Sequence, residues 1–218
     1  MNALVLVAGG SGRRMGSSVP KQYLELQGKA VIIHTLERFY QYDPHIKIVV
    51  VLAENHQSYW KKVSSSSEAA KASEVVYGGE NRYDSVKQGL ALIPDGCIVG
   101  IHDAVRPLVS QETIGRCYRA ARETGSGIPV VEMDESLRLI SPKGSVNLER
   151  ENLRRVQTPQ VFKSELIREA YRHDFPPSVT DDASVYEFIH GALTLVEGNP
   201  ENIKITKASD LDLASLII

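Results

Sequence analysis

Short apolar runs recur along this chain at intervals that leave room for a helix between them. Three of these runs, residues 3–8 (ALVLVA), 47–53 (KIVVVLA) and 97–102 (CIVGIH), are apolar along almost their whole length. Strands of this kind are buried on both faces, as in a parallel sheet with helices packed on either side. The runs therefore predict an α/β fold.

The segments between the runs have the periodicity of amphipathic helices. Apolar residues three and four apart predict helices at 31–42, 82–93 and 113–123, with weaker strands at 73–77 and 126–131. Such alternation implies right-handed crossovers and a Rossmann-like fold, with a mostly parallel sheet and helices on both faces. Further on, we expect helices at 164–173 and 180–190, a strand at 192–197 and a final helix from Ser209.

The turn after the first run is rich in glycine and in positive charge. Gly9, Gly10 and Gly12 have no Cβ, so backbone N–H groups there can approach a phosphate chain closely. Arg14 and Lys21 follow in the same loop and add positive charge beside the glycines. The segment predicts a binding site for a nucleoside triphosphate. The alternative is an ordinary glycine-rich βα turn with solvated arginines.

Two common phosphate-binding motifs do not match this turn. A P-loop needs Gly-Lys-Ser/Thr, whereas Gly16 is followed by Ser17 and Ser18. The dinucleotide fingerprint needs glycine where Met15 stands, and an acidic residue about 20 positions on, where the chain reads VIIHT. A triphosphate site here would therefore be of a different kind.

The alternation of strands and helices breaks between residues 132 and 156. Two alternating stretches, 136–140 and 145–148, flank the turn sequence SPKG, which predicts a hairpin projecting from the α/β core. A lone two-stranded ribbon is only marginally stable in water. We therefore expect residues 132–156 to form an inserted β-arm that packs on something else, most simply a second subunit in a homodimer.

Composition and charge exclude several classes of protein. A formal net charge of −2 over 218 residues lacks the basic excess of nucleic-acid binders, so no nucleic-acid partner is expected. No apolar run approaches the roughly 18 residues that span a bilayer, and no signal-peptide pattern precedes the first strand, which predicts a cytoplasmic protein without membrane contact. Cys97 and Cys117 lack CxxC spacing and are expected to be buried thiols.

Polar residues follow two more of the expected strands, and parallel sheets bind ligands at the carboxyl ends of their strands. In residues 78–85 (GGENRYDS), Arg82 and Ser85 suit a base or a phosphate, although a capped turn explains the segment equally well. Beyond the third apolar run, Asp103 suits a ribose hydroxyl or magnesium, the alternative being a surface ion pair with Arg106. The preceding His102 fits a structural histidine better than a base.

Near the C-terminus, Lys204 stands between Ile203 and Ile205. If this segment is a strand, the lysine points away from both isoleucines, toward the phosphates of a bound nucleotide. The alternative is an edge lysine whose stem covers apolar surface.

Six ordered blocks of the chain resemble one known family: AGGSGRRMGSSVPKQYL, GGENRYDSV, HDAVRP, ERENLRRVQTPQVF, TDDAS and EGNPENIKIT. They are similar to the 2-C-methyl-D-erythritol 4-phosphate cytidylyltransferases, the CTP-using enzymes of the non-mevalonate isoprenoid pathway. The resemblance covers essentially the whole chain, so it implies one nucleotidyltransferase domain over residues 1–218, with 132–156 as a dimerisation element. It also implies CTP and a polyol phosphate as substrates and Mg²⁺ as cofactor.

Carried over position by position, the resemblance assigns roles to individual residues. The catalytic cations that it implies are Arg14, Lys21, Arg150 and Lys204. The nucleotide-binding residues that it implies are Gly9, Gly10, Ser11, Gly12, Gly79, Glu80, Arg82, Ser85, Asp103 and Ala104, with Asp103 also facing the metal. The substrate-binding residues expected are Arg106, Ser136, Arg150 and Thr180.

The arm departs from the family pattern at one place. The family usually has Asp-Thr-x-Lys where this chain has Glu135-Ser136-Leu137-Arg138, so the hydroxyl and the charge are retained but the guanidinium has a different geometry. Ribitol-5-phosphate cytidylyltransferases share most of the blocks and are the alternative, although residues 149–156 resemble the erythritol type. A non-catalytic nucleotide sensor is a third reading, and the loss of Arg14 or Lys21 would have indicated it; both are present.

Overall fold

The computed structural model describes residues 1–10, 19–175 and 179–218. In these residues, eight strands form one sheet whose path runs β10-β7-β11-β6-β1-β4-β5, with β12 beside β7. The three apolar runs are β6, β1 and β4, which lie next to one another at its centre. The strands are β1 (Asn2–Ala8), β4 (Lys47–Leu52), β5 (Glu74–Tyr77), β6 (Ile98–Asp103), β7 (Ser126–Glu132), β10 (Arg154–Val156), β11 (Gln160–Lys163) and β12 (Leu195–Glu197).

Most of the sheet is parallel, as the sequence predicts. β1 pairs in parallel with β4 and β6, β4 with β5, and β7 with β12. By contrast, β11 runs antiparallel between β6 and β7, and β10 runs antiparallel to β7. These two strands were not predicted, because three or four residues carry too little periodicity to stand out.

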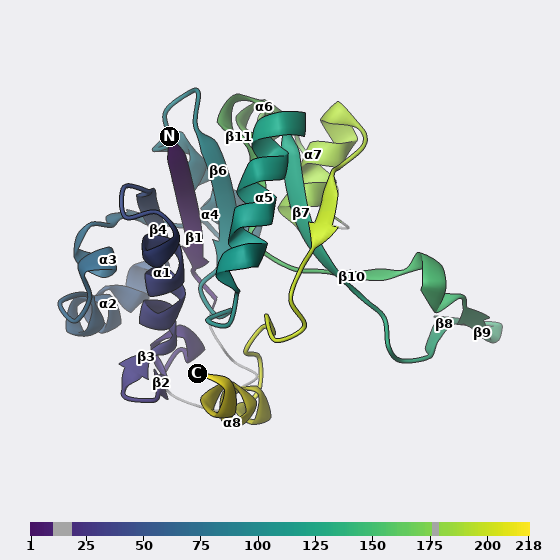
Figure 1. Ribbon diagram of the computed structural model, residues 1–218, viewed down its shortest axis with the longest axis horizontal. Coiled ribbons are helices and arrows are strands. Elements are labelled where there is room, and N and C mark those ends of the chain that lie inside the picture. Colours follow the sequence, from purple (N-terminus) through teal and green to yellow (C-terminus); the bar gives the residue numbers. More distant parts are fainter. Residues whose placement is uncertain (11–18, 176–178) are drawn as a thin grey trace.

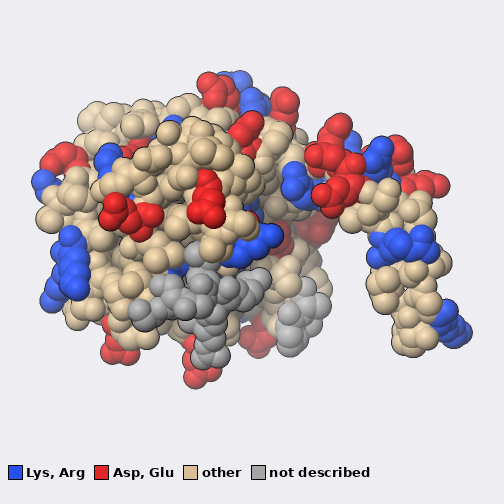
Figure 2. All heavy atoms as spheres, turned by 90° about the horizontal axis from the view of Figure 1, so that it is seen from below, with Lys and Arg blue, Asp and Glu red and all other residues tan. Residues whose placement is uncertain are grey.

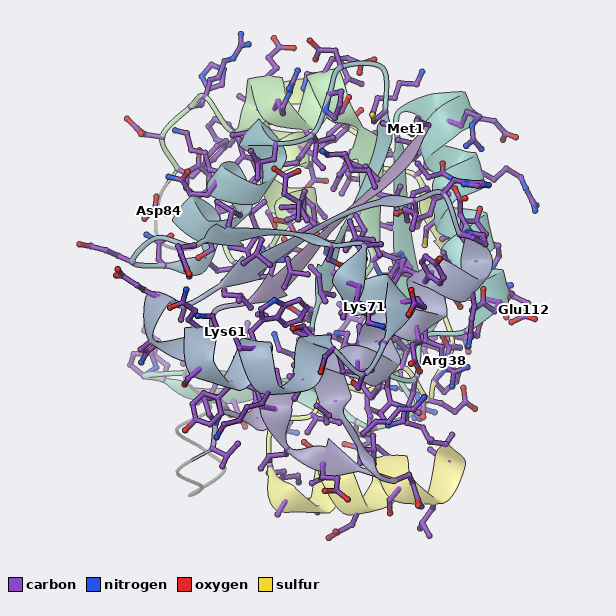
Figure 3. All side chains as sticks on the ribbon, turned by 90° about the vertical axis from the view of Figure 1, so that its left-hand side faces the viewer. Met1, Arg38, Lys61, Lys71, Asp84 and Glu112 are labelled. Carbon is purple, nitrogen blue, oxygen red and sulfur yellow. The ribbon has the colours of Figure 1, made fainter. Side chains whose placement is uncertain are left out.

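Helices cover both faces of the sheet (Figure 1). The longer ones are α1 (Val31–Tyr42), α2 (Gln57–Ser64), α4 (Arg82–Ala91), α5 (Gln111–Thr124), α6 (Ser164–Ala170), α7 (Asp182–His190) and α8 (Ala208–Ile217). Shorter elements are η2 (Lys21–Tyr23), β2 (Glu25–Leu26), β3 (Lys29–Ala30), η3 (Glu54–His56), α3 (Glu68–Lys71) and η4 (Arg150–Asn152). In Figure 3, Lys61 and Lys71 mark α2 and α3, on the side of the molecule away from the arm.

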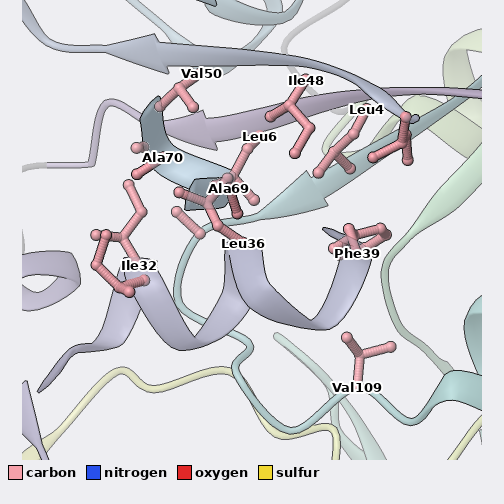
Figure 4. Packing of buried hydrophobic residues seen from close by; sticks show 14 of the residues in the cluster. Leu4, Leu6, Ile32, Leu36, Phe39, Ile48, Val50, Ala69, Ala70 and Val109 are labelled. Atoms are coloured by element: carbon pink, nitrogen blue, oxygen red, sulfur yellow. The ribbon is translucent and has the colours of Figure 1, made fainter. Parts of the chain in front are cut away.

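Successive side chains of β1 face opposite helical layers. Leu4 and Leu6 belong to a buried cluster with residues of α1 and α5, whereas Val5 belongs to a second cluster with residues of α4, α6 and α7. Figure 4 shows the first cluster, where Leu36 and Phe39 of α1 face the strands. This two-sided burial is the reason why the strand reads as a continuous apolar run.

Helix boundaries differ from the predicted ones by a few residues. α1 spans 31–42 as predicted, but α7 begins at Asp182 rather than at residue 180, because the side chain of Asp181 caps it by accepting from the backbone N–H of Ser184 (3.1 Å). Residues 201–206 are not a strand. The strand predicted around Lys204 was therefore wrong, and alternation does not direct this side chain. Lys204 nevertheless lines the cavity described below.

The predicted hairpin is present as β8 (Leu137–Ser141) and β9 (Gly144–Leu148), paired antiparallel. Together with its two connecting legs it projects away from the sheet and stands clear of the body of the molecule (Figures 1 and 2). Its apolar side chains Leu139, Ile140 and Val146 are more than half exposed, at 55, 73 and 58%. Exposed apolar groups of this kind mark a surface suited to another protein surface.

Both cysteines are buried and free, as predicted. Burial raises the pKa of the Cys117 thiol to about 12, so it stays protonated at neutral pH. Among the described residues, no helix combines the length and the apolar character needed to cross a membrane.

Candidate active site

A cavity of about 510 Å³ opens at the carboxyl ends of β1 and β6. This is the edge at which parallel sheets bind their ligands. The described residues that line it are Val7, Ala8, Gly9, Gly10, Lys21, Gln22, Gly79, Glu80, Asn81, Arg82, Ser85, Asp103, Ala104, Val105, Lys204 and Thr206. Most of the nucleotide-binding residues implied by the resemblance therefore share one cleft, far apart though they are in the chain.

The glycine turn enters the cleft directly from β1. The side-chain amide of Gln22 donates to the carbonyl oxygens of Ala8 (2.6 Å) and Gly10 (3.2 Å). Because N–H and C=O point in opposite directions in a trans peptide, holding the Ala8 carbonyl turns the Gly9 N–H the other way, which favours an anion there. Ser11, Gly12 and Arg14 lie outside the described residues.

Lys21 lies on η2 and lines the same cleft. Its ammonium group donates to the backbone carbonyl of Ile205 (2.9 Å), although the residues are 184 positions apart. The side chain is therefore held between the N-terminal and C-terminal parts of the chain, with its charge beside the cavity.

Asp103 is the buried anion of the cleft. Its Oδ2 atom lies 3.0 Å from Nζ of Lys204 and 3.3 Å from Nε of Arg106. Burial alone would raise the pKa of this carboxyl group, but the positive charges of Lys204, Arg82 and Arg106 outweigh burial and hold the pKa well below its usual range. The predicted ion pair with Arg106 is thus present, but inside the protein rather than on its surface.

Arg106 contacts a residue of the cleft, Asp103, without lining the cavity itself. Its guanidinium group donates to Asp103 and to the backbone carbonyl of Asn202 (2.7 Å), and it is absent from the described lining of the cavity. These contacts tie the end of β6 to the segment that carries Lys204. The substrate-binding role expected for Arg106 stays a prediction.

Arg82 makes a bidentate pair with a carboxylate that sequence reasoning treated only as part of a helix start. Its two terminal nitrogens lie 2.8 and 2.5 Å from the carboxylate oxygens of Asp182, which is fully buried and also accepts from the hydroxyl of Tyr171 (2.6 Å). Burial opposes the charge on Arg82, yet Asp182 raises the pKa of the guanidinium above its ordinary value. The sequence TDDAS contained a signal for this pair: Asp181 alone suffices to cap the helix, so the second aspartate, Asp182, was free for another role.

The turn before α4 requires glycine. A Cβ on Gly78 would lie 2.4 Å from Oγ of Ser85, and a Cβ on Gly79 would lie 2.4 Å from the Cβ of Asp84. The side chain of Asn81 caps α4 by accepting from the N–H of Asp84 (2.9 Å). The capped turn that the sequence offered is therefore present, and the same residues line the cleft; their contact with a base or a phosphate stays a prediction.

His102 is fully buried beneath Asp103 and its ring is neutral. Nε2 donates to the carbonyl of Arg106 (3.2 Å), which leaves Nδ1 to accept from the hydroxyl of Thr158 (2.9 Å). The same hydroxyl accepts from the backbone N–H of Asp103 (3.2 Å). Burial lowers the pKa of His102 to about 3. The geometry supports the structural histidine predicted from the sequence.

Three of the residues expected to bind the substrate do not reach the cleft of this chain. Ser136 and Arg150 lie on the arm and Thr180 precedes α7; all three are exposed and none lines the cavity. Arg150 instead donates to the backbone carbonyl of Asp134 (2.6 Å) within the arm.

Among the described residues, no group of three or more His, Cys, Asp or Glu side chains could hold a metal ion by itself. Asp103 and Glu80 are the carboxylates among the described lining residues. Magnesium commonly takes one or two carboxylates and fills its remaining positions with water and substrate phosphates. The carboxylates that line the cleft are therefore compatible with a metal that arrives with a triphosphate.

A glycine turn, a buried carboxylate and several fixed cations at the carboxyl edge of a parallel sheet define a nucleotide-binding α/β protein. A family model for 2-C-methyl-D-erythritol 4-phosphate cytidylyltransferase matches residues 2–218. The chain belongs to this family, and the nucleotidyltransferase class that the sequence indicated is thereby confirmed.

Individual relatives agree with the family match. A Bacteroides thetaiotaomicron protein of that name is 45% identical over 216 residues, which are 99% of each chain. A Porphyromonas gingivalis protein of the same name is also 45% identical, over 98% of this chain and 96% of its own. A Thermus thermophilus crystal structure of the same enzyme has a TM-score of 0.79 at 29% identity, with 100% of this chain and 98% of that chain covered. A Francisella tularensis structure has a TM-score of 0.81 at 29% identity, with both chains fully covered.

The buried, neutral His102 predicts a specific pH dependence of stability. With a pKa near 3 in the folded state against 6.5 when unfolded, only the unfolded chain takes up this proton on acidification below pH 6.5. Stability is therefore lost as the pH falls, by an amount from this residue that approaches about 1.4 kcal/mol per pH unit well below pH 6.5. In His102→Asn, the slope of stability against pH, measured by urea unfolding between about pH 6.5 and 5, should be smaller by about 1 kcal/mol per pH unit. The exposed His45→Asn is the control for removing an imidazole; equal slopes for His102→Asn and wild type would contradict the assignment.

Proposed function

We propose that the protein transfers the cytidylyl group of CTP to 2-C-methyl-D-erythritol 4-phosphate, releasing pyrophosphate. The observation that carries this proposal is the cleft itself, where Lys21, Arg82 and Lys204 surround a glycine turn and the ionised Asp103. Relatives that match nearly the whole chain bear the name of this activity.

The proposed reaction is an in-line displacement at phosphorus. An oxygen of the substrate phosphate attacks the α-phosphorus of CTP, the bond from that phosphorus to the bridging oxygen breaks, and pyrophosphate leaves with the electron pair. The attacking phosphate is already an anion at neutral pH, so the step requires no general base. Its barrier comes from bringing two anions together, and fixed cations in a preorganised site lower it.

Lys21 and Lys204 are suited to that task by their anchoring. Lys21 is held by the carbonyl of Ile205 and Lys204 by the carboxylate of Asp103. Both ammonium groups are therefore already in place when the negative charge at the α-phosphate grows, so no reorganisation is needed in the transition state. We assign both to the transferring phosphate, with Arg14 as a third cation from the sequence.

Magnesium is the cofactor that we propose, with Asp103 as its protein ligand. When bound, it would neutralise charge on the triphosphate. The pKa of Asp103 is held low, so its carboxyl group is ionised at neutral pH and remains anionic beside Lys204 and Arg106.

The turn before α4 is proposed to bind the base. Gly79, Glu80, Arg82 and Ser85 line the cleft, and we assign Asp103 and Ala104, which also line it, to the ribose. Backbone groups at fixed positions can read the hydrogen-bonding edge of cytosine, and a site built for a hydrogen bond rejects bases that cannot form it.

The test of the function is pyrophosphate release from each nucleotide with each acceptor. CTP with 2-C-methyl-D-erythritol 4-phosphate should react, and UTP, ATP and GTP should be slower by about 1,000-fold or more. Ribitol 5-phosphate is the matched acceptor, because both are phosphorylated polyols. Faster turnover with ribitol 5-phosphate would overturn the acceptor assignment, and comparable rates with UTP would overturn the base assignment.

The arm is proposed to complete the cleft of a second subunit in a C2 homodimer. Its apolar residues Leu139, Ile140 and Val146 are exposed, and Arg150 lies on η4 within the arm rather than in the cleft of its own chain. A two-fold exchange of arms would bury these side chains and bring Arg150, Ser136 and Arg138 to the partner's substrate. In this assembly we expect Thr180 and Arg106 to belong to the subunit whose cleft accepts the arm. Separately, we propose that the enzyme is cytoplasmic.

Complementation between two inactive variants tests the exchanged arm. Lys21→Ala and Arg150→Ala should each be inactive alone, but a mixed dimer holds one cleft with both residues intact. After subunit exchange, activity should return to about a quarter of wild type for random mixing. If exchange is demonstrated by mass spectrometry and activity stays absent, Arg150 serves its own subunit and the proposal is wrong.

A further inference from the structure

Polar side chains from the end of β10 to the first residue of β11 are buried without touching the cleft. Gln157, Thr158 and Gln160 are only 5, 6 and 1% exposed, and none of them is among the described lining residues of the cavity. Buried amides and hydroxyls are destabilising unless they are hydrogen-bonded. Their partners therefore show what this segment, which follows the arm directly, holds in place.

The carboxamide of Gln157 is bonded to the loop that leads to Lys204. Its Nε2 donates to the backbone carbonyl of Asn199 (2.8 Å), while Oε1 accepts from the Asn199 N–H (3.3 Å) and from the side chain of Asn202 (3.4 Å). A Cβ on Gly198 would lie only 2.4 Å from this Oε1 atom, so the loop passes close against the amide.

Asn202 is the second half of this attachment and is fully buried. Its side chain donates to the carbonyl of Thr158 (2.8 Å), and its own carbonyl accepts from Arg106 (2.7 Å). Residues 202–206 have no helix or strand of their own. Hydrogen bonds from side chains therefore fix this loop in place, as backbone hydrogen bonds to a neighbouring strand would fix a strand.

Lys204 lies between two fixed points of the loop. On one side Asn202 is bonded to Gln157 and Thr158, and on the other the N–H of Ile205 donates to the carbonyl of Val105 (2.9 Å). The side chain of Lys204 itself is 40% exposed and reaches Asp103 at 3.0 Å. Its backbone, not its packing, thus determines where the ammonium group can reach.

Gln160 is bonded to a different part of the molecule, which makes it a natural control. Its amide donates to Asp181 (2.8 Å) and accepts from the N–H of Ala183 (2.7 Å) at the start of α7. Two buried glutamines of one short segment therefore hold two different loops.

We propose that Gln157 is a positioning residue for Lys204: it fixes the loop 198–202 so that the ammonium group of Lys204 stays at the α-phosphate position of the cleft. The placement of the loop follows from the contacts above, whereas the effect on turnover rests on the proposed function. Gln157 touches no substrate in this account and acts only through the lysine.

Amide hydrogen exchange on the ligand-free protein tests the placement. In Gln157→Met, which keeps the length of the side chain but makes no hydrogen bond, exchange in residues 199–205 should speed up by about tenfold or more. Gln157→Ala also removes the hydrogen bonds, should speed up the same exchange, and serves if the methionine variant folds poorly. Gln160→Met should leave exchange in residues 199–205 as in wild type. Unchanged exchange in folded Gln157 variants would overturn the proposal.

A double-mutant cycle tests the route to catalysis. Gln157→Met should lower kcat by about 10- to 100-fold with a smaller change in the KM for CTP, because displacement of a reacting group costs rate more than binding. In a Lys204→Ala background the same substitution should lower kcat no further. An equal loss in both backgrounds would show that Gln157 does not act through Lys204. Absence of turnover in wild type would overturn the proposed function, and the exchange result would then decide the placement by itself.

Discussion

The cleft depends on the ion pairs that the ionised carboxylate of Asp103 makes with Lys204 and Arg106. This carboxylate is buried at the end of a central strand, and it stays charged because Lys204 and Arg106 contact it directly while Arg82 adds a further positive charge. Removing one partner of such a group would leave an uncompensated charge in a medium of low dielectric. The carboxylate and its cations therefore hold one another in place, and the cleft presents fixed positive charge to an anionic ligand.

The sheet determines where this carboxylate lies. β6 runs between β1 and β11, and both faces of the sheet are covered by helices, so a polar residue at the strand's carboxyl end is buried on most sides. The loops that meet there come from distant parts of the chain. They are joined by side-chain bonds, such as Lys21 to Ile205 and Gln157 to Asn199, where strand pairing is absent. In the loop that carries Lys204, order thus comes from hydrogen bonds of buried side chains rather than from a helix or a strand.

Much of this could be predicted from the sequence, for identifiable reasons. β1, β4 and β6 were evident because two-sided burial removes polar residues from a strand. Gly9 and Asp103 were evident as candidates because they lie at the ends of apolar runs, and Lys21 because it adds positive charge to the loop that carries the glycines. The bidentate pair of Arg82 and Asp182 was not, because 100 residues separate them and a single sequence carries no signal of contact. β11 was missed because four residues have no measurable period.

The most direct test of this account is turnover of Asp103→Asn at saturating CTP and 2-C-methyl-D-erythritol 4-phosphate. Asparagine has the same shape but no charge, so Lys204 would lose its ionic partner and the proposed magnesium ion would lose its protein ligand. We predict that pyrophosphate release falls by about 100-fold or more in a variant that circular dichroism shows to be folded. A folded variant that turns over within about twofold of wild type would contradict the claim that this carboxylate organises the site.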